Sequence, residues 1–95
     1  MSMKEAYEKK LQSKLDELSA EIDKLKAKAD SAEADAKLEY YKQIDELRAM
    51  HDAAGKKLDE LREAGDNAWE DLKAGIESAL DSLSSSIKSA VSRFS

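Results

Sequence analysis

The chain has 95 residues, contains no cysteine and no proline, and carries a formal net charge of −5. Its length suffices for one domain, and the missing cysteines exclude disulfides and thiolate metal sites. The slightly acidic balance argues against nucleic acid as a partner. Neither a signal segment nor an apolar run long enough for a bilayer is present, so a soluble cytoplasmic protein is expected.

Apolar or small residues recur along nearly the whole chain with the period of an α-helix, about 3.6 residues. No alternation typical of β-strands competes with this row, which predicts an all-α protein. Much of the first two thirds follows the heptad pattern of left-handed coiled coils. The stretch SMKE, from Ser2 to Glu5, is a capping box that predicts a helix start. We therefore expect one long amphipathic helix over residues 3–64, approximately.

Residues 30–33, with the sequence DSAE, also fit a capping box, inside this long helix. The heptad phase continues through them and no glycine precedes them, which favours a continuous helix. The alternative is a turn at this point. With a second turn near residue 65, the chain would then form three helices of similar length and a monomeric three-helix bundle.

The stretch AGDNAWE predicts a stop and a restart. Gly65 can take the left-handed conformation that commonly ends a helix, and Asn67 with Glu70 forms another capping box. We expect a break at residues 65–67 and a shorter C-terminal helix over residues 67–93, approximately.

This C-terminal helix follows an 11-residue repeat, and such a repeat keeps its apolar stripe nearly straight. Serines occupy the opposite face, and two acidic and two basic residues leave residues 77–95 without net charge. Such a helix could insert into curved lipid surfaces, although packing on the long helix is the favoured interpretation. The possible lipid or partner face consists of Trp69, Leu72, Ile76, Leu80, Leu83, Ile87, Val91 and Phe94.

A helix of 62 residues would be about 93 Å long, and the C-terminal helix would cover less than half of it. The uncovered apolar stripe would need another chain, so we expect a homo-oligomer in which coiled-coil hairpins pair into a bundle. The expected oligomer interface consists of Leu11, Leu15, Leu18, Ile22, Leu25, Ile44, Leu47, Leu58 and Leu61.

The only histidine, His51, stands in the apolar row. One histidine without cysteines cannot make a typical metal site, so a polar residue at the edge of the core is expected. The serines at 84–86 are near no histidine or lysine arrangement that could activate a nucleophile, and the carboxylates lie close to lysine or arginine as on a solvated face. We expect no catalytic residues, no cofactor and no enzyme activity.

Three stretches, KAKADSAEADAKLEYYKQIDELR, AWEDLKAGIESALDSL and IKSAVSRFS, resemble small bacterial coiled-coil proteins grouped as stress-response proteins of unknown mechanism. The resemblance implies a cytoplasmic helical protein with a loose link to stress, and it supplies no active-site residues. The sequence thus favours a self-associating structural or interaction protein. The alternative is a peripheral membrane protein that binds lipid through its C-terminal helix.

Overall fold

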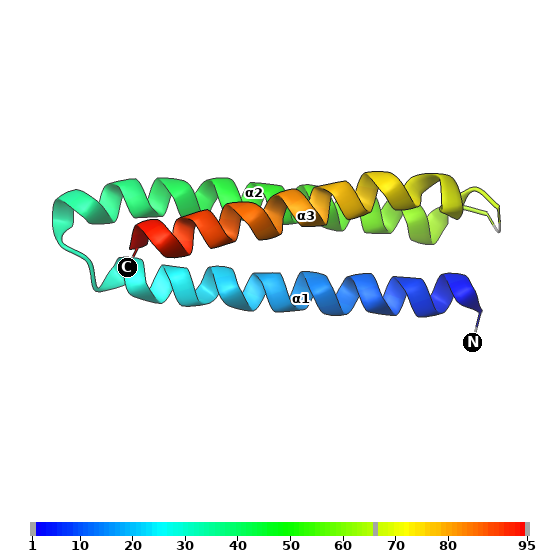
Figure 1. The fold of residues 1–95 in the computed structure, drawn as a ribbon, viewed down its shortest axis with the longest axis horizontal. Coiled ribbons are helices and arrows are strands. Elements are labelled where there is room, and N and C mark those ends of the chain that lie inside the picture. The colour runs from blue at the N-terminus through cyan, green and yellow to red at the C-terminus, as the bar shows by residue number, and fades with distance from the viewer. Residues whose placement is uncertain (1, 66, 95) are drawn as a thin grey trace.

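The computed structural model describes residues 2–65 and 67–94, and they form a bundle of three helices in which the second runs antiparallel to the first and third (Figure 1). The helices are α1 (Met3–Asp30), α2 (Ala34–Glu63) and α3 (Trp69–Phe94). The bundle measures 51 × 19 × 18 Å, so its length is close to that of one helix. The all-α fold class expected from the sequence is confirmed.

The start of α1 follows the capping box in the sequence. Ser2 is its N-cap, and the backbone N–H of Glu5 donates to the Ser2 hydroxyl at 3.1 Å. This bond satisfies one of the N–H groups that the first turn of a helix leaves without a partner. The first helical residue is Met3, where the capping box predicts it.

The prediction of one continuous helix over residues 3–64 is wrong, because the chain reverses at residues 31–33. Ser31 ends α1 in a near-helical conformation, with φ −92° and ψ −3°, and its N–H bonds to the carbonyls of Lys28 and Ala29. Glu33 is extended, with φ −65° and ψ 154°, and α2 follows it. Local signals favoured a helix here. Folding back lets the chain bury its own apolar stripe, and the free energy gained by this burial exceeds the cost of forming one turn.

The second break lies near the predicted place but has a different geometry. Ala64 is extended after the last turn of α2, and no described glycine, Gly65 included, has a positive φ. The backbone N–H groups of Ala68 and Trp69 both bond to the Gly65 carbonyl, at 3.1 and 3.4 Å. Helix α3 begins at Trp69, two residues after the expected start at Asn67, which lies in the turn. Residue 66 of the expected break lies outside the described residues.

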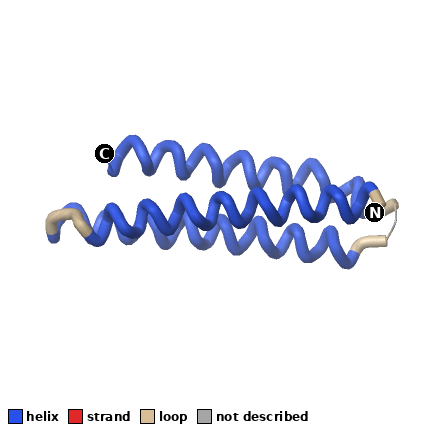
Figure 2. The backbone as a smooth tube through the Cα atoms, turned by 90° about the horizontal axis from the view of Figure 1, so that it is seen from below, coloured by secondary structure: helices blue, strands red, loops and turns tan. Residues whose placement is uncertain are grey.

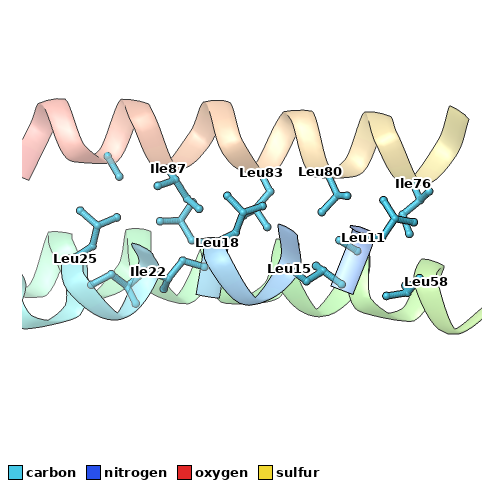
Figure 3. Close-up of a cluster of buried hydrophobic side chains, with 14 of the residues drawn as sticks. Leu11, Leu15, Leu18, Ile22, Leu25, Leu58, Ile76, Leu80, Leu83 and Ile87 are labelled. Carbon is cyan, nitrogen blue, oxygen red and sulfur yellow. The ribbon is translucent and has the colours of Figure 1, made fainter. Parts of the chain in front are cut away.

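The core runs along the axis of the bundle, where apolar stripes of all three helices meet (Figure 3). Figure 2 shows α3 lying alongside the two helices of the hairpin. Every buried residue that the structure describes is apolar. The stripe around Leu11–Leu25 is covered by the same chain, so the expectation that it needs another chain is also wrong.

Candidate interaction surfaces

All nine residues expected at an oligomer interface lie in the core of the single chain. None of their side chains is more than 4% exposed. They come from α1 and α2, and Figure 3 shows several of them pointing toward α3. The neighbouring helices of the same chain cover these residues, so they cannot form a surface that contacts another folded copy. These residues are Leu11, Leu15, Leu18, Ile22, Leu25, Ile44, Leu47, Leu58 and Leu61.

The stripe of α3 expected to meet lipid or a partner is also mostly packed on the hairpin of α1 and α2. Leu72 is half-buried, and Val91, at 43% exposure, is the stripe residue most open to solvent. The serine face opposite is exposed, as its composition predicts. The stripe thus packs on protein in this structure. Its buried members are Trp69, Ile76, Leu80, Leu83, Ile87 and Phe94.

An aromatic cluster attaches the first turns of α3 to the first turns of α1. The rings of Tyr7 and Trp69 lie 5.7 Å apart, and the Lys73 ammonium is 4.9 Å from the centroid of each. The Tyr7 hydroxyl donates a hydrogen bond to the Glu77 carboxylate. Burial, together with this bond and the negative charge of Glu77, raises the pKa of Tyr7 well above its usual value.

A second aromatic pair attaches the other end of α3, this time to α2. Tyr40 stacks on Phe94 with ring centroids 4.0 Å apart, and the Tyr40 hydroxyl donates to the Arg93 carbonyl at 3.3 Å. Stacked aromatic pairs contribute about 0.5–1.5 kcal/mol beyond the area they bury. Helix α3 is therefore held by apolar contacts along its length and by an aromatic pair at each end.

Polar side chains cross the seam between α1 and α2 at several levels. Arg48 pairs with Asp23 at 3.3 Å near the middle, and Arg62 donates to the Gln12 side chain at 2.8 Å. The Lys4 ammonium donates to the carbonyls of Arg62 and Ala64, at 2.9 and 2.8 Å. There it meets the negative end of the α2 dipole. Within the described ranges, no ion pair joins α3 to the hairpin in this way.

The hairpin is also pinned beside its turn. Tyr41 of α2 donates its hydroxyl proton to the Asp30 carboxylate at the end of α1, and the Lys26 ammonium lies 2.9 Å from the same carboxylate. These two contacts, the tyrosine bond first, hold the pKa of Asp30 below its usual value.

His51 has the packing role that the sequence suggests. It is half-buried on α2, and its Nε2 lies 2.9 Å from the Leu15 carbonyl of α1. A carbonyl oxygen only accepts, so Nε2 carries the proton in this bond. The residues that the structure describes include no group of metal-ligating side chains around it or elsewhere.

A groove follows the seam between α1 and α3 and has a volume of about 560 Å³. Leu11 and Leu80 contribute apolar surface to it. Lys10, Lys14 and Glu17 line it from α1, whereas Glu77 and Asp81 line it from α3. Lys14 also pairs with Glu17 of its own helix at 3.9 Å, so the groove carries charges of both signs.

Neither aromatic attachment was predicted from the sequence, nor was the contact of Lys4 of α1 with the last carbonyls of α2. Tyr7 and Tyr40 stand in the apolar row, which was the available signal for aromatic contacts between helices. Lys4 gave no such signal, because its partners are carbonyls about sixty residues away in sequence.

No family model matches this chain, and no curated protein or solved structure matches it either. Of the helices within the described residues, none combines the length and the apolar character needed to cross a bilayer.

Proposed function

We propose that this chain is a non-enzymatic helical interaction protein that associates with further copies of itself. Its buried residues, as far as they are described, are all apolar and all belong to helices. Contacts of this kind depend on shape and apolar area, and the same helix supplied by another chain makes them equally well. The wholly apolar and wholly helical core, as far as it is described, is the observation that supports the proposal.

We propose that copies associate by exchanging helices. An exposed apolar stripe, as expected from the sequence, does not drive the association, because the stripes are buried in the single chain. A folded monomer already buries its core, so it does not need a partner to be stable. The fraction of associated chains should therefore rise with protein concentration. Sedimentation equilibrium of the full-length chain over a wide range of concentrations tests the proposal. We expect a rising average mass, and a monomer at every concentration would contradict it.

A second candidate function, reversible binding to curved lipid surfaces, is favoured by the way α3 is attached. Helix α3 combines a bulky apolar stripe with an exposed serine face of no net charge. Among the described residues it lacks the ion pair that α1 and α2 share. A helix held mainly by apolar contacts can transfer its stripe to a membrane interface, where equivalent apolar area is buried.

Flotation of the full-length chain with small, uncharged vesicles tests this candidate, and two variants provide a matched comparison. Val91→Asp puts a charge into the stripe at a position exposed in the bundle, so the fold tolerates it. Ser85→Asp puts the same charge on the serine face. We expect salt-insensitive binding that Val91→Asp abolishes and Ser85→Asp retains. Equal binding by both variants, or none by the parent chain, would contradict lipid insertion through the stripe.

Trp69, the only tryptophan, is a poor reporter of that insertion. It is only 5% exposed in the folded chain, so its surroundings are apolar before any lipid is present.

A cytoplasmic location and a link to stress are further proposals, which rest on the resemblance to small bacterial stress-response proteins.

A further inference from the structure

We infer that two copies of this chain exchange α1 by straightening the turn at residues 31–33. In the exchanged dimer, α1 and α2 of each copy form one continuous helix. The α1 part of that helix packs on the α2–α3 pair of the other copy. This inference rests on the proposed self-association, and it names the partner as a second copy and the hinge as this turn.

Ser31, the first residue of the turn, is already in a near-helical conformation. Glu33 has a φ of −65°. That φ matches an α-helix, for which about −63° is typical, so at Glu33 it is ψ that has to change. No glycine or proline occurs in residues 31–33, and no described residue has a positive φ. Nothing in these residues therefore opposes a continuous helix.

The turn also leaves the start of α2 poorly capped. Glu33 occupies the N-cap position, but its side chain makes no capping hydrogen bond. By contrast, Ser2 caps α1 through its hydroxyl. The first N–H groups of a helix lack partners within it, and in a continuous helix the last carbonyls of α1 would accept from those of α2. Straightening therefore adds backbone hydrogen bonds at the hinge and removes no side-chain cap.

The apolar row keeps its phase across the hinge. Ala29 is buried, and Ala32 and Ala36 are half-buried, at steps of three and four residues. A straight helix would thus present the stripes of α1 and α2 on one side, ready for an antiparallel copy. Cross-helix contacts such as Asp23–Arg48 would form again between copies, because each half of the dimer repeats the packing of the monomer.

The second turn does not have these properties. It spans residues 64–68, and the first N–H of α3 already bonds to the Gly65 carbonyl. The apolar pattern also changes there, from heptads to the 11-residue repeat. This turn is also longer than residues 31–33 and contains the extended Ala64, so we assign the exchange to residues 31–33.

Proline at the first residue of α2 separates the two states. Ala34→Pro suits the monomer, because proline is favoured at the first helical position and the preceding Glu33 is already extended, as proline requires. In a continuous helix the same proline is interior, where it removes a hydrogen bond and clashes with the preceding turn. Met3→Pro is the matched control, at the first position of α1, 78% exposed and helix-initial in both states.

The experiment refolds each full-length chain from denaturant at high concentration and measures the dimer dissociation constant. We expect a dimer of the parent chain and of Met3→Pro. We expect at least a hundredfold weaker dimer for Ala34→Pro, since both long helices would carry an interior proline. If Ala34→Pro dimerises as well as Met3→Pro, exchange at this hinge is wrong while self-association stands. If no chain dimerises, both proposals fail.

Distances within one chain give an independent readout. Cysteines introduced at the exposed Ala20 and Ala53 would be the only ones in the chain and can carry spin labels. Labelled chains refolded with an excess of unlabelled chains report intramolecular distances alone. In the dimer we expect about 50 Å, from 33 residues at about 1.5 Å each. A dimer that keeps the short distance of neighbouring helices, whose axes lie about 8–10 Å apart, would overturn the exchange.

Discussion

The hairpin of α1 and α2 has charged and amide side chains across its seam, whereas α3 is attached by apolar contacts and by an aromatic pair at each end. The hairpin carries most of the charge of the chain, and the last nineteen residues have none in sum. Both attachments bury apolar stripes in one common core.

The two kinds of contact have different effects: polar contacts fix the register of α1 against α2, whereas apolar contacts supply most of the free energy that holds α3 in place. Hydrogen bonds and ion pairs are directional, so contacts such as His51 to the Leu15 carbonyl fix how α1 and α2 slide past each other. Between its ends, α3 is held by apolar contacts that lack this restriction, and the directional hydrogen bonds of Tyr7 and Tyr40 lie near its two ends. We therefore expect α3 to open from the bundle more readily than the hairpin separates.

The largest expected effect comes from Leu83, which lies at the middle of the α3 stripe and is 0% exposed. Leu83→Ala leaves a cavity there and should lower the free energy of unfolding by roughly 2–5 kcal/mol. Urea denaturation measures this loss. Amide exchange measured alongside should accelerate more in α3 than in α1, because the substitution weakens the contact that opens first.

Val91→Ala is the matched control for this substitution. It shortens a residue of the same stripe at 43% exposure, and the stability should change by no more than about 0.5 kcal/mol. If both substitutions cost the same, the stripe is not what docks α3. If Leu83→Ala accelerates exchange equally in all helices, the bundle opens as one unit and the contrast with the hairpin fails.

A smaller effect is expected from the two glycines inside helices. Gly55 of α2 and Gly75 of α3 each have open space where a Cβ would stand. Replacing either by alanine should therefore stabilise the chain by about 1 kcal/mol, the difference in helix propensity. Gly75→Ala should slow amide exchange in α3, and Gly55→Ala should leave α3 unchanged. Equal slowing of α3 by both would show that α3 does not open separately.

The helical period and the start of α1 were predictable because both depend on local sequence. The row of apolar residues gave the core positions of all three helices, and Ser2 marked the first helix. The break before α3 followed from the stretch AGDNAWE, although Gly65 does not take the left-handed conformation expected there. What these signals could not supply was the balance between a turn and a continuous helix at residues 31–33.

That balance is decided by contacts between residues far apart in sequence. A helix from 3 to 64 satisfies every local preference, yet it exposes Leu11–Leu25 unless another chain covers them. The turn costs little locally, and it lets α2 and α3 of the same chain bury that stripe. The same reason explains why the nine residues expected at an oligomer interface lie in the core of the single chain, because a core stripe and an oligomer stripe have the same sequence pattern.

The smallest expected effect concerns the hydrogen bond between Tyr7 and Glu77, and it depends on pH. Tyr7→Phe keeps the half-buried ring beside Trp69 and loses only the hydrogen bond from the hydroxyl group to Glu77. At neutral pH we expect a loss of about 0.5 kcal/mol in the free energy of unfolding, the lower end for one hydrogen bond. Urea denaturation of both chains at a series of pH values measures the difference.

Above about pH 10, the usual pKa of tyrosine, this difference should shrink and then reverse. Burial first, and the bond and charge of Glu77 next, raise the pKa of Tyr7, so the folded chain holds the proton more tightly than the unfolded chain. The stabilisation is therefore complete below the unfolded pKa and is lost as the pH rises toward the folded one. Glu77→Gln keeps the burial and should retain part of this slope. Identical pH dependence of the parent chain and Tyr7→Phe would show that this aromatic end does not hold α3 as described.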